Sequence, residues 1–108
     1  MPFHNPAERT PKELFPGAVA RTFWGEKMLL SYLDLAPGSF VPPHSHPHEQ
    51  AGIVLEGELE FTIGGETRIV KAGEIFIIPG GVEHSVKVGE APARALDIFS
   101  PVREEYQW

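Results

Sequence analysis

The sequence predicts an all-β fold in which short antiparallel strands close into a barrel or pack as two sheets. The chain of 108 residues contains 11 glycines and 11 prolines, which favours frequent turns and disfavours long helices. Between these turn residues lie short runs of aliphatic, aromatic and β-branched side chains that show no helical periodicity. Many short strands separated by turn signals are typical of closed or double-sheet antiparallel architectures.

The strand-like runs follow one another along most of the chain. A hairpin is expected where Gly25 and Glu26 separate the first two runs. Gly57 separates the next pair of runs, and Gly64 and Gly65 together give a further strong turn signal. In chain order, the predicted strands cover residues 19–24, 28–35, 50–56, 58–63, 67–71, 75–78, 84–88 and 94–99.

A single domain is expected, with an N-terminal arm at residues 1–16 and a barrel at residues 17–108. A chain of this length buries one modest hydrophobic core. The first segment is rich in proline, and only residues 11–15 favour a helical turn. We expect this segment to pack as an arm, across a partner subunit.

Composition excludes several classes of function. A formal net charge of −6 disfavours nucleic-acid binding. No apolar run approaches the about 18 residues that a membrane span requires, and the N-terminus lacks the apolar stretch of a signal peptide. The absence of cysteine rules out disulfides and thiolate metal sites. We therefore expect a cytoplasmic protein that binds neither nucleic acid nor membrane.

Histidines are concentrated in two blocks punctuated by glycine and proline, which contain His44, His46, His48 and His84. Alternate residues of an extended strand project from the same face, so His44 and His46 are expected to present two imidazoles side by side. Gln50 and His84 complete a four-ligand cage if the chain folds back as a barrel. Imidazole nitrogens and an amide oxygen suit a divalent transition metal, so the pattern predicts a Zn, Ni, Mn or Fe site.

The neutral side chain of Gln50 affects the chemistry of such a site. Three imidazoles and an amide leave the full charge of a divalent ion uncancelled, so the metal would attract anionic ligands. The neighbouring Glu49 is expected to point away from the histidine pair, because it lies one residue out of register. His48 is expected to support the site or to lie on the surface, although it can replace a ligand in another geometry.

The two histidine blocks resemble the two motifs of the cupin superfamily. The residues that match the first motif are Gly38, His44, His46 and Gly57, with Gln50 where the motif has glutamate. The residues that match the second motif are Gly73, Pro79, Gly81 and His84, with Val88 in place of its final asparagine. The resemblance implies a single-domain cupin, which is a double-stranded β-helix or jelly-roll barrel.

A longer stretch, residues 16–106, is similar to the small cupins called pectin degradation proteins. The similarity is carried by residues 44–50, 54–64 and 97–105. That family opens the ring of 4,5-unsaturated uronate monosaccharides, released by pectin and alginate lyases, and gives their linear keto form. The resemblance implies a metal-dependent ring-opening isomerase. The metal ligands it implies are His44, His46, Gln50 and His84, and the substrate-site residues it implies are Asp97, Phe99 and Arg103.

The alternation of side chains along residues 95–99 gives separate evidence about the placement of Asp97 and Phe99. Leu96 and Ile98 share one face of the expected strand, and Asp97 and Phe99 share the other. A carboxylate and an aromatic ring on one face suit a ligand cavity. The alternative is that Asp97 faces solvent near the end of the strand.

Each substrate-site residue has an expected role. Asp97 would move protons, because a carboxyl group in a cavity can have a raised pKa. Arg103 would bind the substrate carboxylate through its planar fork, and Phe99 would pack on the sugar and exclude water. The alternative for Arg103 is a surface ion pair with Glu104 or Glu105.

Other functions and the state of assembly stay open. A three-histidine site with open positions also suits Fe(II) and O₂, so a cupin oxygenase, or an isomerase of another small anionic substrate, is an alternative. A non-catalytic cupin that binds a sugar or anion is another. The resemblance, together with apolar groups at Tyr106 and Trp108, makes a homodimer the expected assembly.

Overall fold

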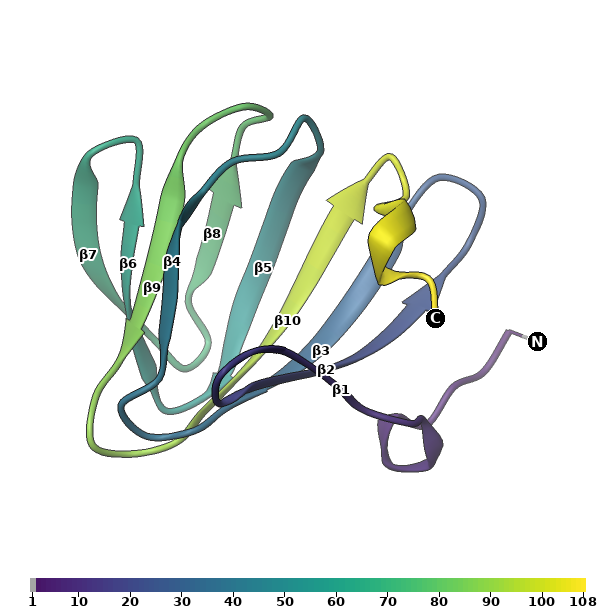
Figure 1. The fold of residues 1–108 in the computed structure, drawn as a ribbon, viewed down its shortest axis with the longest axis horizontal. Coiled ribbons are helices and arrows are strands. Elements are labelled where there is room, and N and C mark those ends of the chain that lie inside the picture. Colours follow the sequence, from purple (N-terminus) through teal and green to yellow (C-terminus); the bar gives the residue numbers. More distant parts are fainter. Residues whose placement is uncertain (1) are drawn as a thin grey trace.

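The computed structural model describes residues 2–108, and within them two antiparallel β-sheets face each other (Figure 1). In these residues the larger sheet has the strand order β1-β2-β3-β10-β5-β8, and the smaller one has the order β4-β9-β6-β7. The chain crosses repeatedly between the sheets, which is the jelly-roll arrangement. The predicted all-β fold class is confirmed. Within residues 2–108 no helix is long and apolar enough to span a membrane.

The predicted strands are all present, and their ends agree with the predictions to within one residue. The bounds are β1 Lys12–Phe15, β2 Ala18–Trp24, β3 Leu29–Leu35, β4 Phe40–His44, β5 Glu49–Glu56, β6 Glu58–Ile63, β7 Glu66–Lys71, β8 Ile75–Ile78, β9 His84–Val88 and β10 Ala93–Ser100. Two short 3-10 helices, η1 Pro6–Glu8 and η2 Glu104–Tyr106, flank the strands.

Residues 11–15 hold a strand, so the helical turn expected there is wrong. In β1, Lys12 pairs with Ala20 and Glu13 pairs with Val19 on β2. The edge of β2 gives the backbone of β1 hydrogen-bond partners that four residues of mixed composition do not reveal in the sequence. The large sheet therefore extends into the segment expected as an arm. Contact of that segment with a partner subunit stays a prediction.

The glycine turns position the sheets as the sequence indicated. The hairpin between β2 and β3 is closed by a hydrogen bond of 3.0 Å from Gly25 N to Met28 O. Gly64 and Gly65, with φ of 57° and 85°, form the turn between β6 and β7, as expected for a two-residue hairpin with positive φ at both positions. Gly57 stands where the chain leaves β5 in the large sheet for β6 in the small one.

The hydrophobic core fills the space between the two sheets at one end of the barrel. Val54 and Leu59 are buried there, and the rings of Phe61 and Phe76 lie 4.4 Å apart between their centroids. Along β6, Leu59 and Phe61 point inward, whereas Glu58 and Glu60 are exposed. Toward the other end, buried positions become polar, and the candidate site lies there.

The two ends of the chain lie on the same side of the molecule and contact each other (Figure 1). Arg9 donates from Nε to the carbonyl oxygen of Thr22 at 3.1 Å and from Nη2 to the carbonyl oxygen of Trp108. The Trp108 indole donates to the carbonyl oxygen of Thr10 at 3.3 Å. The hydroxyl of the buried Thr22 donates to the carbonyl oxygen of Tyr106 at 2.6 Å. These contacts, here called the terminal clasp, fasten the C-terminal segment to β2.

Candidate functional site

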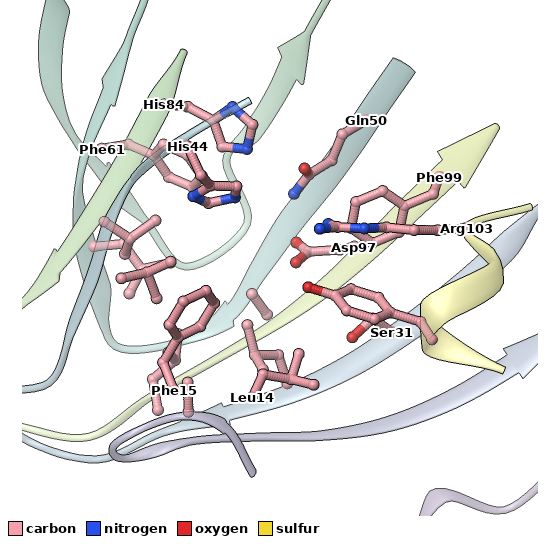
Figure 2. A pocket seen from close by; sticks show the side chains of 18 residues that line it. Leu14, Phe15, Ser31, His44, Gln50, Phe61, His84, Asp97, Phe99 and Arg103 are labelled. Atoms are coloured by element: carbon pink, nitrogen blue, oxygen red, sulfur yellow. The ribbon is translucent and has the colours of Figure 1, made fainter. Parts of the chain in front are cut away.

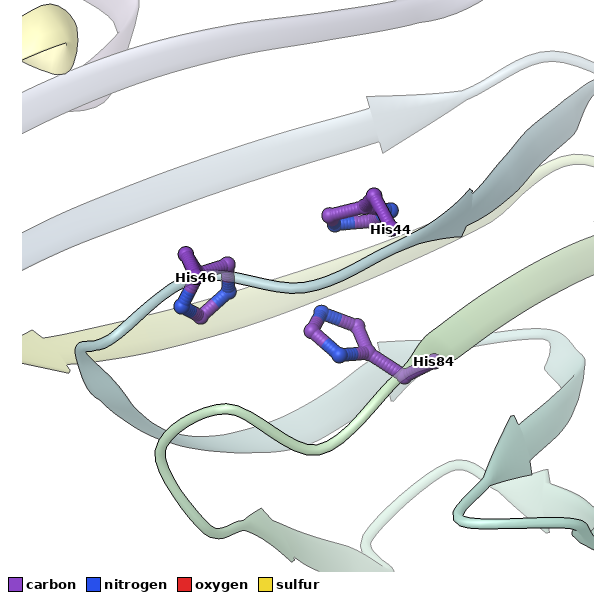
Figure 3. A group of neighbouring side chains, drawn as sticks. All are labelled: His44, His46 and His84. Atoms are coloured by element: carbon purple, nitrogen blue, oxygen red, sulfur yellow. The ribbon is translucent and has the colours of Figure 1, made fainter.

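Three histidines meet at the polar end of the barrel (Figure 3). His44 is the last residue of β4 and is the cross-strand partner of His84, the first residue of β9. His46 lies beyond the end of β4, in the loop to β5, and its ring centroid is 5.0 Å from that of His84. The potential ligand nitrogens of all three lie within 4.8 Å of one another. This three-histidine cluster has the size of a metal site.

Hydrogen bonds to the backbone orient the three imidazoles in the same way. The Nδ1 atoms of His44, His46 and His84 lie 2.8, 3.0 and 2.9 Å from the carbonyl oxygens of residues 42, 48 and 82. A carbonyl oxygen only accepts, so each Nδ1 carries a hydrogen. In its neutral form each ring then leaves its Nε2 lone pair free for a metal, and metal-binding histidines commonly donate their other nitrogen to a backbone carbonyl oxygen in this way.

The fourth predicted ligand lies beside the cluster. Gln50, on β5, is buried, and its Oε1 is 3.0 Å from Nε2 of His46. In the neutral ring these two atoms are both acceptors, and their contact becomes favourable when a cation lies between them. Nε2 of His84 is buried and has no hydrogen-bond partner within residues 2–108. A divalent ion bound to these atoms would satisfy all of them, so the donor set fits a transition metal.

Burial keeps two of the imidazoles in the form that binds metal. It is the main reason that the pKa of His84 is lowered from 6.5 to about 4. The pKa of His46 is also lowered, chiefly by burial and further by the charge of Arg103. Both rings are therefore neutral near neutral pH, and no proton has to leave before a metal binds.

Asp97 and Phe99 project from β10 into the same pocket, so the alternative in which Asp97 faces solvent is wrong. The side chain of Asp97 is buried and lies on the inner face, between its cross-strand partners Ser31 on β3 and Gly52 on β5. A Cβ atom on Gly52 would come within 2.9 Å of Asp97 Oδ1, so the glycine leaves room for the carboxyl group. Burial raises the pKa of Asp97 to about 7, although the charge of Arg103 acts in the opposite direction.

Arg103 follows β10, forms an ion pair with Glu105 and also lines the pocket, while its expected binding of a substrate carboxylate stays a prediction. Its Nε donates to Glu105 Oε1 at 2.5 Å, yet only 12% of its side chain is exposed. The guanidinium lines the pocket, stacked 4.1 Å from the centre of the Tyr106 ring and 5.2 Å from that of Phe99. Figure 2 shows it beside Asp97, across the pocket from two of the histidines.

Two further hydroxyl groups line the pocket that sequence reasoning did not find. Ser31 is buried on β3 directly opposite Asp97, and Tyr106 reaches the pocket from η2. Inward alternation along β3 could have indicated Ser31 once that strand was placed next to β10. The sequence carries no comparable signal for Tyr106, because its position depends on the terminal clasp.

The neighbours of the predicted ligands take supporting or external positions. Glu49 is exposed, as its register predicted. His48 contributes its carbonyl oxygen to His46, and its ring centroid lies 5.6 Å from that of His46. The structure therefore places six of the seven predicted site residues in one pocket wall. The seventh, His46, contacts Gln50 and His84 of that wall, and Glu49 lies outside it.

Comparison with known proteins places these observations in a family. The cupin domain family matches residues 31–99, a range that includes the histidine cluster, Gln50 and Asp97. The pectin degradation protein KdgF of Dickeya dadantii is 29% identical over 102 residues, which cover 92% of this chain and 93% of that protein. The oxalate oxidase GF-3.8 of Triticum aestivum is 38% identical over 81 residues, 66% of this chain, and the chain spans 36% of its length.

A solved structure agrees over almost the whole fold. The structure of KdgF from Halomonas sp. matches with a TM-score of 0.88 and 26% sequence identity, covering 95% of this chain and 96% of that one. The match of the family over most of the chain, the jelly-roll fold and the histidine motifs agree with one another. The chain therefore belongs to the cupin family.

Proposed function

We propose that this protein converts 4,5-unsaturated uronate monosaccharides, from pectin or alginate breakdown, to their linear keto form in a metal-dependent reaction. The observation that carries the proposal is a single pocket in which Asp97, with a pKa of about 7, and Arg103 lie across from two members of the three-histidine cluster, His44 and His84. The relative named for pectin degradation, which aligns with nearly the whole chain, supports this substrate class.

The residues of the pocket divide the work of binding. His44, His46, Gln50 and His84 would hold the metal, which when bound supplies Lewis-acid stabilisation for negative charge that develops on a substrate oxygen. Arg103 offers a planar fork that fits the uronate carboxylate. The buried ring of Phe99 packs against the sugar and keeps water from the reacting atoms.

Ring opening moves one proton and leaves the oxidation state of the sugar unchanged. The ionised carboxylate of Asp97 accepts the proton of the anomeric hydroxyl, and the bond between the anomeric carbon and the ring oxygen breaks. This gives an aldehyde and an enolate. Asp97 then returns a proton to the former alkene carbon, which completes the ketone. A pKa of about 7 makes both forms of Asp97 available near neutral pH.

The test follows the loss of far-ultraviolet enol-ether absorbance when metal-loaded protein is mixed with 4,5-unsaturated galacturonate. Chelated protein, Gln50→Ala and Asp97→Asn run beside it, with the spontaneous reaction as the blank. Metal-dependent loss in the wild type and at least about 100-fold slower loss in Asp97→Asn are expected, since a positioned acid–base group contributes about 10²–10⁴-fold. No acceleration by metal-loaded wild type refutes the proposal, and full activity of Asp97→Asn refutes its proton transfer. The alginate-derived epimer is assayed in parallel.

A second candidate is oxygen chemistry, or isomerisation, on another small anionic substrate. It is favoured by the identity to an oxalate oxidase and by the three-histidine cluster. Oxygen consumption that depends on added Fe(II) or Mn(II) and a small carboxylate would support it. Tight binding of uronates without turnover would instead indicate a non-catalytic cupin that binds a sugar or anion.

We also propose that two copies associate through the outer face of the large sheet. On β8, Ile75 and Ile77 are 69% and 63% exposed, and Leu55 on β5 and Ile98 on β10 are exposed on the same face. Contiguous exposed aliphatic side chains of this kind mark interaction sites. A dimer in light scattering that Ile77→Lys converts to a monomer would support this assembly. The cytoplasm stays the proposed compartment.

A further inference from the structure

Arg103 is held from two directions, and both contacts leave its terminal nitrogens free. Glu105 accepts from Nε at 2.5 Å, on the side of the guanidinium away from its tip. Tyr106 lies against the guanidinium plane at 4.1 Å, and Phe99 lies farther along at 5.2 Å. Within residues 2–108, Nε is the one atom of this guanidinium that donates to a protein group. The two Nη atoms remain available to a ligand.

The two partners of this ion pair differ in their surroundings. The side chain of Arg103 is 12% exposed and lines the pocket, whereas that of Glu105 is 56% exposed and does not. Glu105 therefore reaches Arg103 from outside the pocket and stands clear of a bound sugar. The turn that carries Arg103 and Glu105, which includes η2, is itself held in place. Tyr106 N donates to Arg103 O at 3.0 Å, and the hydroxyl of Thr22 donates to the Tyr106 carbonyl oxygen.

We infer that Glu105 is a positioning residue: it fixes Arg103 through Nε so that both Nη atoms face the carboxylate of a uronate substrate. A carboxylate is bound best by two parallel N–H donors. A long side chain that is free to rotate must lose that freedom when its ligand binds, and an anchored one does not. The inference rests on the proposed function, since it takes the Arg103 ligand to be a sugar carboxylate.

The opposite role for Glu105 makes a different prediction. A carboxylate so close to Arg103 could instead compete with the substrate for the guanidinium. If it competes, its removal tightens binding of carboxylate sugars. If it positions the arginine, its removal weakens that binding.

The experiment compares Glu105→Ala and Glu105→Gln with Glu104→Ala, a control on the same turn. For 4,5-unsaturated galacturonate, Glu105→Ala should raise KM about two- to tenfold and leave kcat nearly unchanged. Glu105→Gln keeps an oxygen that accepts from Nε and should restore KM to near the wild-type value. Glu104→Ala should match the wild type. Unchanged or lowered KM in Glu105→Ala, or a Glu105→Gln variant as weak as Glu105→Ala, overturns the inference.

A second readout separates this inference from the proposed reaction. Binding of D-galacturonate and of the neutral sugar D-galactose to zinc-loaded protein is measured by calorimetry, and the ratio of the two affinities gives the preference for galacturonate. The part of this preference that is lost in Arg103→Met is the share that Arg103 supplies. That share should fall in Glu105→Ala even if no ring opening occurs. No preference for galacturonate in the wild type, or a preference that Glu105→Ala leaves intact, overturns the role of Glu105.

Discussion

Replacement of Asp97 by asparagine should make the metal-free protein more stable near neutral pH. The carboxyl group has an ordinary pKa of 3.8, and burial raises it to about 7 in the fold. Between these values the folded state keeps a proton that the unfolded state has lost. A folded state that binds more protons loses stability as pH rises, so the contribution of Asp97 falls between about pH 4 and pH 7.

The size of the effect follows from the two pKa values. A difference of about three units, at about 1.4 kcal/mol each, amounts to about 4 kcal/mol. Since small domains have a free energy of unfolding of about 5–15 kcal/mol, this is a large share of the total. Asparagine has nearly the same shape and cannot ionise, so Asp97→Asn does not lose this free energy as the pH rises.

Urea unfolding of chelated wild type and Asp97→Asn at several pH values measures the difference. The stability of the wild type relative to the variant should decrease by about 4 kcal/mol from about pH 4 to above pH 7. Titration of His84 occurs in both proteins and cancels in the comparison. Parallel pH profiles would refute the reasoning, because they would mean that the carboxyl group ionises in the fold as easily as in the unfolded chain. Added zinc should lower the pKa of Asp97 and reduce the difference.

Three further outcomes are expected. The pKa of His84 is lowered from 6.5 to about 4, so between these pH values the folded state binds fewer protons than the unfolded state. The contribution of His84 to stability therefore falls by about 3 kcal/mol as the pH falls from about 6.5 to about 4. The acid unfolding profile of chelated His84→Gln should lack this loss of stability. Zinc at about 100 times its dissociation constant should stabilise the wild type by about 2.7 kcal/mol in thermal unfolding, and His84→Gln should show a much smaller shift. Gly52→Ala should lose about 1–3 kcal/mol, since its new Cβ would lie 2.3 Å from Phe76 Cζ. The control Gly89→Ala, which has no atom within 4 Å of the new Cβ, should stay within about 0.5 kcal/mol of the wild type in the same assay.

The fold could be predicted from the sequence because its strands have local signatures. Alternation along β6 and the glycine pair at 64–65 specify both the strands and their turn without knowledge of the partner sheet. β1 has no such signature. Its four residues form a strand because β2 offers a free edge, which is a property of the assembled sheet.

Part of the candidate site could be predicted from local spacing, whereas Gln50 and His84 required the assumption that the chain folds back as a barrel. His44 and His46 are close in sequence, so their spacing indicated a shared site. Asp97 and Phe99 share a strand face, but spacing alone left open whether Asp97 faces the pocket or solvent. Tyr106 reaches the pocket through contacts between distant parts of the chain. For Arg103, the sequence suggested either an ion pair with a neighbouring glutamate or a place in the substrate site. Both arrangements are compatible, because the ion pair with Glu105 and the pocket involve different sides of one guanidinium.

Because of the terminal clasp, changes to residues 1–10 or near Trp108 are expected to affect the substrate side of the pocket. Arg9 and Trp108 are separated by almost the whole sequence, yet Arg9 binds the carbonyl oxygen of Trp108, just beyond the segment that presents Arg103 and Tyr106. Deleting residues 1–10 would remove the contacts of Arg9 and Thr10 with Trp108, so that of the terminal clasp only the bond from Thr22 to the Tyr106 carbonyl oxygen would be left, while the histidine cluster would be untouched. A preparation altered in this way could bind metal normally and still give a misleadingly poor affinity for its substrate.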